Sequence, residues 1–166
     1  MRLEEVLIEA AQMGDVEEVL RLERTVEEAP HWEGRAYVDA VGGEGGVERR
    51  MVVARHRTGG QLLGFAVAAV MGVGQERWGE LESVAMVAAW RRVGVGRAMC
   101  LAMMAWCGER GARWVELEVR ASSAGARSLY GQLGFAEHGL RRGYYRAPVE
   151  DAILMRAVLD DPLPVP

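Results

Sequence analysis

The chain has 166 residues, of which 50% are hydrophobic, which suffices for one well-buried core but not for two full domains. Its formal net charge of -4 gives no general attraction for nucleic acid or anionic lipid, so we expect neither as a partner. The longest apolar stretch, Leu62 to Val73, is shorter than the roughly twenty residues of a membrane span, and the acidic start lacks the pattern of a secretory signal. We therefore expect a cytoplasmic protein whose residues 1–160 form a single domain, with 161–166 as a frayed tail.

The first half of the chain carries the patterns of strands and short amphipathic helices. Asp15 is predicted to be the N-cap of a helix, because apolar residues recur at a helical period after it. The glycine-rich stretch Gly42 to Gly46 ends a second helix, and Thr58-Gly59-Gly60 provides the turn of a hairpin. The expected elements are a strand at Val6–Ala11, helices at Val16–Val26 and Glu33–Val41, and strands at Met51–Arg55, Leu62–Met71 and Glu80–Val87.

The second half is predicted to contain a strand, a glycine loop, a helix and a further strand in that order. Such an order indicates a crossover unit with a parallel strand pair, and ligands tend to bind at the carboxyl ends of such strands. A polar loop rich in Arg and Tyr is expected between the last two strands. The expected elements are a helix at Arg97–Arg110, a strand at Trp114–Val119, a helix at Ala124–Leu133, and strands at Phe135–His138 and Ala152–Val158.

The cysteines and histidines lack the spacing of metal ligands. Cys100 and Cys107 lie in one expected helix about two turns, or ~10 Å, apart, which is too far for a disulfide. We expect both to be reduced thiols in the core. His31, His56 and His138 are scattered, and we predict no metal site.

The segment Arg91 to Arg97, with the sequence RRVGVGR, lies between an expected strand and an expected helix. Glycines here let backbone N–H groups approach an anion, and a helix N-terminus adds roughly half a positive charge. An ordinary tight turn explains the two glycines alone equally well. The residues expected around the anion are Arg92, Val93, Gly94, Val95, Gly96 and Arg97.

Two better-known phosphate loops fit this segment less well. A P-loop needs a Gly-Lys-Ser/Thr ending, and the chain contains no lysine. The dinucleotide fingerprint would put Met99 where a small residue is needed, although Glu116 and Glu118 lie near the distance for a ribose-binding acid. Dinucleotide binding stays open as the weaker alternative.

The spacing Arg91-x-x-Gly94-x-Gly96 matches the R/Q-x-x-G-x-G/A signature of the GNAT acetyltransferase superfamily. Around it, from Val84 to about Leu159, the chain resembles the ribosomal-protein-alanine N-acetyltransferase family in a series of segments with matching order and spacing. These segments are Leu117–Ser122, Leu129-Tyr130, Leu133–Phe135, Arg141-Arg142, Tyr144-Tyr145 and Glu150–Ala152.

The resemblance implies an α/β fold, classed as α+β in some schemes. In this GNAT fold a central mixed, mostly antiparallel twisted sheet contains a splayed parallel strand pair and has helices on both faces. Acetyl-CoA would lie on one side of the splay and a protein N-terminus on the other, with direct acetyl transfer between them. The implied acceptor is a ribosomal protein that begins with alanine, and we expect a monomer or a weak dimer.

The resemblance also implies two catalytic residues, Glu118 as base and Tyr130 as acid. Both have plainer interpretations, since Glu118 fits the outward face of an alternating strand and Tyr130 the edge of an amphipathic helix. The residues implied in cofactor binding are Val84, Ala85, Met86, Arg92, Val93, Gly94, Val95, Gly96, Arg97 and Ser123, and those implied in acceptor binding are Trp32, Tyr144 and Tyr145. Arg91, Arg120 and Arg127 are either phosphate contacts or solvated surface charges.

Three positions depart from the family pattern. Ser123 stands where the family has a cofactor-contacting Asn, Val87-Ala88 replaces an acidic-proline turn, and His31 interrupts a Pro-Trp pair where substrate would enter. Two other functions therefore stay open. The acceptor could be a small amine or another protein N-terminus, or the chain could be a catalytically silent acyl-CoA-binding module.

Overall fold

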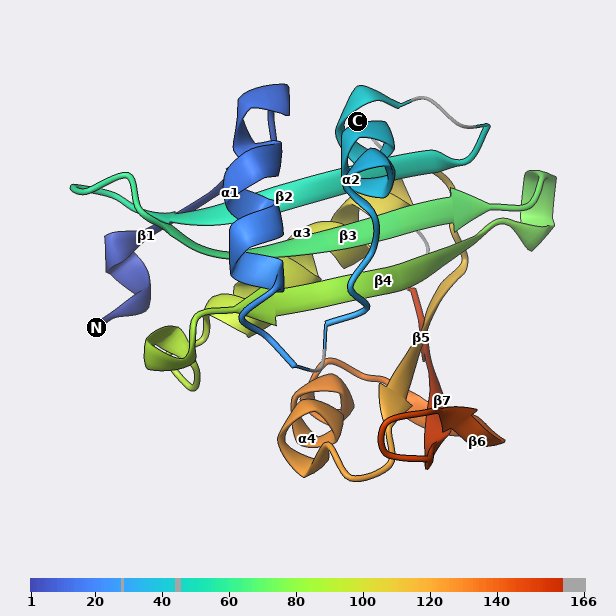
Figure 1. The fold of residues 1–166 in the computed structure, drawn as a ribbon. Helices are drawn as coiled ribbons and strands as arrows, with labels where there is room; N and C mark the ends of the chain where they lie inside the picture. The colour runs from blue at the N-terminus through green and yellow to red at the C-terminus, as the bar shows by residue number, and fades with distance from the viewer. Residues whose placement is uncertain (28, 44–45, 160–166) are drawn as a thin grey trace.

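The computed structural model describes residues 1–27, 29–43 and 46–159, and it is built around one seven-stranded sheet (Figure 1). The strand order is β1-β2-β3-β4-β5-β7-β6, and every neighbouring pair is antiparallel except β4 and β5. The strands are β1 Val6–Ala10, β2 Glu48–His56, β3 Leu62–Met71, β4 Trp78–Met86, β5 Trp114–Arg120, β6 Ala136–Tyr145 and β7 Glu150–Val158. The predicted mixed, mostly antiparallel sheet with one parallel pair is confirmed.

Helices cover both faces of this sheet, as predicted. Figure 1 shows α1 and α2 in front of β2 to β4, α3 behind them, and α4 beside β5. The helices are α1 Val16–Glu23, α2 Gly34–Gly42, α3 Val95–Glu109 and α4 Ala124–Gln132. Apolar side chains on the two faces form two separate cores, one under α1 and α2 and one under α3. Strand β3 is buried between them along almost its whole length, which explains why its sequence is continuously apolar.

Strand β4 contains a bulge that determines which side chains face which core. Val67 of β3 pairs with Ser83 and Ala68 pairs with Leu81, so Glu82 is the extra residue. Before the bulge, Leu81 packs in the core under α3; beyond it, Met86 packs against that core. The bulge therefore reverses the alternation of side chains in the second half of the strand.

The parallel strands β4 and β5 are joined only at their amino-terminal ends. Their register contains two residue pairs, Gly79 with Val115 and Glu80 with Glu116, and the two strands diverge beyond these pairs (Figure 1). The predicted splay is therefore present. It leaves a gap in the sheet between the carboxyl-terminal halves of β4 and β5.

The last two strands were predicted too short. We expected a strand only over Phe135–His138, followed by a long loop, whereas β6 continues to Tyr145 and β7 begins at Glu150. Because β6 is an edge strand, its side chains are exposed on both faces. It therefore lacks the apolar alternation by which a half-buried strand is recognised.

Asp15 is the N-cap residue of α1, as predicted, but without a capping bond from its side chain. Its carboxylate instead accepts a hydrogen bond from the Gln12 backbone N–H, at 2.7 Å, and pairs with Arg55 at 2.6 Å. The helix ends at Glu23, and Val26 is buried beyond it.

Two predictions concern residues outside the described ranges, one in part and one entirely. Gly43 ends α2 in the left-handed conformation, with φ 71°, as expected of a glycine after a helix. Residues 44–45 of the glycine-rich stretch and the tail 161–166 lie outside the described residues. No helix in the described parts of the chain is long and apolar enough to span a membrane.

The two cysteines are free and buried on α3, so the prediction of reduced core thiols is confirmed. Burial raises the pKa of both Cys100 and Cys107 to about 12. Thiols of this kind stay protonated at neutral pH and are poor nucleophiles.

A Cβ on Gly79 would come within 2.7 Å of the Cys107 sulfur, so the glycine lets α3 pack closely on β4.

Candidate active site

The amino terminus of α3 is shaped to receive an anion. Gly94, with φ 94°, and Arg92, with φ 62°, are both in the left-handed region, and such residues turn successive N–H groups toward one concave side. The Ala98 N–H donates to the Gly94 carbonyl at 3.0 Å, so the amides before it precede the regular hydrogen bonding of the helix. The side chains of Arg92 and Arg97 are exposed. Phosphate binding by these groups stays a prediction.

The carboxyl end of β4 packs directly against this helix start. A Cβ on Gly96 would lie 2.5 Å from the terminal methyl of Met86, and one on Gly64 of β3 would lie 2.8 Å from the Ala85 carbonyl oxygen. Val84 and Met86 are partly exposed and Ala85 is buried. The structure thus brings together the strand end and the glycine segment that the resemblance implied in cofactor binding.

Glu118 projects from β5 on the face covered by α1 and α2. Its neighbours Leu117 and Val119 pack into the core under α3, so alternation places the carboxylate on the opposite side. The Glu118 side chain is 20% exposed and pairs with Arg141 of β6, with Nε 3.1 Å from Oε1. This ion pair holds the carboxylate in place beside the splay.

Tyr130 approaches from the other face of the sheet. It lies on α4, packs against the core under α3 and makes an edge contact with Phe135 at a centroid distance of 5.8 Å. Burial raises the pKa of the Tyr130 phenol, and its neighbours Cys100 and Tyr145 raise it further. Tyr145 interacts electrostatically with Glu118 as well, so Glu118 and Tyr130 share a neighbour although they lie on opposite faces.

Tyr144 and Tyr145 form an aromatic pair on β6, and not in a loop as predicted. Their ring centroids are 5.2 Å apart. The Arg120 guanidinium lies 4.2 Å from the Tyr145 centroid, and that of Arg141 lies 5.5 Å from the Tyr144 centroid. The Glu118 charge is the main cause that raises the pKa of Tyr144, and a hydrogen bond to Glu118 also contributes. The pair therefore lies beside the predicted base.

Ser123 and two arginines lie near the start of α4. Ser123 is the N-cap residue of this helix, but its hydroxyl does not bond to the helix. Arg127 donates to the Ala121 carbonyl at 2.9 Å, and Arg120 donates to Glu150 at 3.3 Å. These protein contacts favour a structural role for Arg120 and Arg127 over phosphate binding.

Trp32 is held at the edge of the face covered by α1 and α2. Its ring contacts Tyr37 of α2 at a centroid distance of 5.3 Å. The preceding residue, His31, has φ 51° and places its Nδ1 3.6 Å from Oε2 of Glu23, a carboxylate that is 1% exposed. The half-exposed His31 ring thus lies next to a buried acid, one residue before Trp32.

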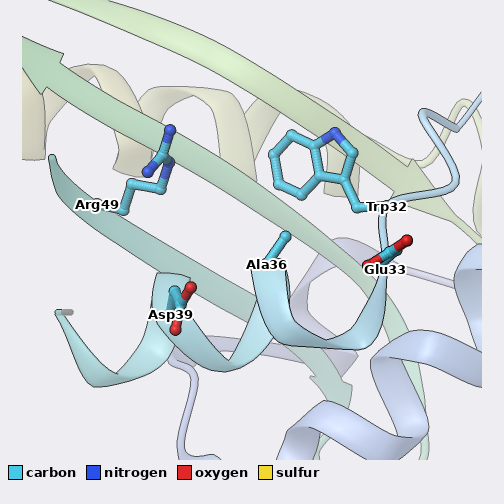
Figure 2. A pocket seen from close by; sticks show the side chains of 5 residues that line it. All are labelled: Trp32, Glu33, Ala36, Asp39 and Arg49. Atoms are coloured by element: carbon cyan, nitrogen blue, oxygen red, sulfur yellow. The ribbon is translucent and has the colours of Figure 1, made fainter. Parts of the chain in front are cut away.

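Trp32 also lines an open groove of about 370 Å³ between α2 and β2 (Figure 2). The remaining lining residues are Glu33, Ala36, Asp39 and Arg49. Arg49 donates to both carboxylate oxygens of Glu82, at 2.8 and 3.0 Å. The bulge residue of β4 therefore fixes one wall of this groove.

Glu80 interacts electrostatically both with Arg49 of the groove and with Glu118. Burial raises the pKa of Glu80, and the carboxylates of Glu82, Glu118 and Glu116 raise it further, while Arg49 lowers it. The four carboxylates therefore lie near one another on one face of β4 and β5. Glu80, Arg49 and Arg141 were not predicted as members of the site, although the alternation of Glu80 and Glu82 with Leu81 and Ser83 was a visible signal for Glu80.

Replacing Glu80 with Gln should raise the stability of the protein at neutral pH. Because the folded state raises the pKa of Glu80, the ionised carboxylate destabilises the fold above that pKa. After allowance for solvent screening we expect a gain of about 0.5 kcal/mol, or about 1–2 °C in Tm. The gain should shrink as the pH falls toward about 4.3, the ordinary pKa of glutamate. Urea unfolding at pH 7 and pH 4 measures this, and an equal gain at both pH values contradicts it.

The chain is similar to known acetyltransferases along most of its length. The family model described as "Acetyltransferase (GNAT) family" matches residues 15–135. N-alpha-acetyltransferase RimI of Mycobacterium tuberculosis is 35% identical over 106 residues, which cover 64% of this chain and 65% of that protein. The [Ribosomal protein bS18]-alanine N-acetyltransferase of Escherichia coli is 42% identical over 77 residues, covering 45% and 52%. The matched part thus spans about half to two thirds of these curated relatives.

Solved structures agree over nearly the whole chain. The ribosomal-protein-S18-alanine N-acetyltransferase from Escherichia coli superimposes with a TM-score of 0.72 at 26% identity, covering 96% of this chain and 97% of that one. Arabidopsis thaliana NAA60 in complex with acetyl-CoA gives a TM-score of 0.81 at 18% identity, covering 93% and 98%. The second likeness concerns the fold alone.

Proposed function

The chain belongs to the GNAT acetyltransferase family, and on that premise we propose that it transfers an acetyl group from acetyl-CoA to the N-terminal α-amino group of a protein. The observation that carries the proposal is the splay between β4 and β5. The start of α3, the predicted phosphate site, lies beside the end of β4, and Glu118 and Tyr130 approach from opposite faces. Two substrates that enter the gap from opposite faces would therefore meet between Glu118 and Tyr130.

The cofactor would lie along the α3 side of the splay. Its pyrophosphate would accept hydrogen bonds from the backbone amides around Gly94 and Gly96, and the exposed guanidiniums of Arg92 and Arg97 would pair with its oxygens. The pantetheine arm would pair with the backbone of Val84–Met86, where β5 has diverged from β4. Val93 and Val95 would line the phosphate loop, and the Ser123 hydroxyl would contact the cofactor from α4.

The reaction would proceed by direct attack. Glu118 takes a proton from the substrate ammonium, and the nitrogen lone pair then attacks the thioester carbonyl carbon. The carbon–sulfur bond breaks, the departing thiolate takes the phenol proton of Tyr130, and the nitrogen loses its second proton to water, which leaves the neutral amide. Water then returns a proton to the Tyr130 phenolate, and Glu118 releases its proton to water. An α-amino group, with a pKa of about 7.7 to 8.0, needs far less help from a base than a lysine amine, with a pKa of about 10.4. A carboxylate base therefore suits a protein N-terminus.

We propose that the acceptor is a ribosomal protein that begins with alanine, and that the reaction takes place in the cytoplasm on a monomer or weak dimer. The support is the similarity to relatives named for that reaction. Trp32, Tyr144 and Tyr145 would bind the first residues of the acceptor. His31 stands beside this site and favours, as a second candidate, another protein N-terminus or a small amine.

Mass spectrometry can test the proposal directly. The protein is incubated with acetyl-CoA and a peptide panel that begins with alanine, serine or methionine, together with small amines such as spermidine. We expect a single acetyl group on the α-amine of alanine peptides. Transfer to small amines only would overturn the protein acceptor, and CoA binding without any transfer would leave the silent module as the function.

Replacing Gly94 with Ala should weaken CoA binding about tenfold. A Cβ there meets open space, with Leu3 nearest at 3.6 Å, but φ 94° strains any residue other than glycine by roughly 1–2 kcal/mol. Relief of that strain turns the amides away from the anion, and 1.4 kcal/mol corresponds to a factor of ten in affinity. Calorimetric titration with CoA measures the change.

Gly60→Ala is the matched control for this variant. Gly60 has φ 64° and open space around its Cβ position, and it lies in the β2–β3 hairpin. It should lower the Tm by a similar amount and leave CoA affinity unchanged. Equal CoA affinity in the Gly94→Ala and Gly60→Ala proteins would exclude the glycine segment as the phosphate site.

A further inference from the structure

We propose that the groove beside Trp32 binds a basic side chain of the acceptor polypeptide, several residues after the amino terminus that is acetylated. This inference rests on the proposed function, because it concerns the acceptor of the same reaction. The groove is defined by Trp32, Glu33, Ala36, Asp39 and Arg49. Figure 2 shows the Trp32 ring, the Asp39 carboxylate and the Arg49 guanidinium around the same open space.

The charges around the groove favour a cation. Its one lining guanidinium, Arg49, is neutralised by the bidentate contact with Glu82. Asp39 pairs with Arg35 at 2.9 Å, but the Arg35 side chain is 74% exposed, and an ion pair so open to solvent is weak. Asp39 is 26% exposed, so its carboxylate can exchange Arg35 for a ligand cation. Glu33 is a second carboxylate in the lining.

Trp32 supplies the second feature that a basic side chain needs. A guanidinium or ammonium over an indole face is attracted by the negative charge of the ring, and its stem packs on the same surface. The indole is supported on one side, because its ring contacts the buried ring of Tyr37. A preformed aromatic wall opposite a carboxylate suits arginine or lysine better than a neutral side chain.

The groove and Glu118 lie on the same face of the sheet, on strands β2 and β5 that are three places apart in the strand order. Across the sheet, Arg49 pairs with Ala69, Ala69 with Glu80, and Glu80 with Glu116. These are three steps between neighbouring strands, about 14 Å at about 4.8 Å each, and Glu118 lies two residues, about 7 Å, beyond Glu116 along β5, which makes the separation of Glu118 from Arg49 about 16 Å. An extended peptide advances about 3.4 Å per residue. A peptide whose amino group lies at Glu118 would therefore place its fifth or sixth side chain at the groove, and it would pass the carboxylates of Glu80 and Glu82 on the way.

A positional scan tests this inference. Eight-residue peptides begin with alanine and carry one arginine at each position from 2 to 7 in a serine-glycine background, with glutamine in place of arginine as the reference. We expect kcat/KM to be highest with arginine at position 5 or 6, about tenfold above the glutamine peptide. The Asp39→Asn enzyme should lose most of that preference. Glu17→Gln is the matched control, because Glu17 also pairs with an arginine one turn away but lies on α1 and is 81% exposed.

Binding measured by calorimetry, in the presence of saturating CoA, separates this inference from the proposed function. Binding that depends on arginine, without acetylation of any peptide, would support the groove and overturn the reaction. Acetylation at equal rates for arginine and glutamine at every position would overturn the inference about the groove and leave the proposed function standing. A preference for arginine that survives Asp39→Asn would also overturn it, and neither binding nor acetylation of any peptide would overturn both.

Discussion

Replacing Glu118 with Gln should lower kcat/KM for peptide acetylation at pH 7 by about 10²- to 10⁴-fold, the usual contribution of a general base. The amide keeps the shape of the side chain but cannot accept the proton of the substrate ammonium. The variant then depends on the small fraction of acceptor that is already neutral. Its residual rate should rise with pH up to the pKa of the α-amino group, about 7.7 to 8.0.

The pH dependence distinguishes loss of a base from loss of structure. The ratio of the wild-type rate to the variant rate should fall as the pH rises from 6.5 to 8.5, when both rates are measured by CoA release. Glu48→Gln is a suitable control, because Glu48 is also a strand glutamate paired with arginine, at 2.9 Å from Arg77 and 3.0 Å from Arg110. A Glu118→Gln enzyme that retains more than half of the wild-type kcat/KM would remove Glu118 from the mechanism.

Replacing Tyr130 with Phe should lower kcat by about 10²-fold or more, because the thiolate loses its proton donor. The substitution removes only the hydroxyl and keeps the ring on Phe135. We therefore expect unchanged affinity for CoA and a Tm within about 2 °C of the wild type. The raised pKa of Tyr130 adds a prediction about pH. The wild-type rate should show no loss from this phenol until the pH exceeds its ordinary value of about 10.

Single-turnover measurements isolate this effect from product release. With enzyme in excess over acetyl-CoA, the Tyr130→Phe protein should form acetyl-peptide slowly while binding both substrates normally. Tyr37→Phe offers a comparison on the other side of the sheet, where burial and the Glu23 charge also raise the pKa of a tyrosine. A Tyr130→Phe enzyme with near-wild-type single-turnover rates would assign the acid to another group.

Features written in local sequence were predictable. The glycine segment before α3 was recognisable because Gly94 adopts a left-handed φ that few other residues accept. The crossover from β4 to β5 followed from the order of strand, loop and helix. A central strand such as β3 was recognisable from its unbroken apolar run, because both of its faces are buried.

Features that depend on a neighbouring strand were not predictable. The length of β6 follows from its pairing with β7, and its exposed side chains carry no alternating pattern. The ion pair of Glu118 with Arg141 joins β5 to β6 although β7 lies between them. The groove beside Trp32 is likewise assembled from α2, β2 and the preceding turn. No local pattern in those segments specifies which residues meet.

The extra residue at Glu82 makes the length of β4 as important as its composition. Side chains along a strand point alternately to its two faces, and the bulge reverses that alternation once, between Leu81 and Val84. Deleting any single residue between the bulge and Met86 would exchange inside and outside for the rest of the strand. Met86 would leave Gly96, and the strand end would no longer fit the start of α3. Insertions and deletions in β4 should therefore be tolerated only in pairs.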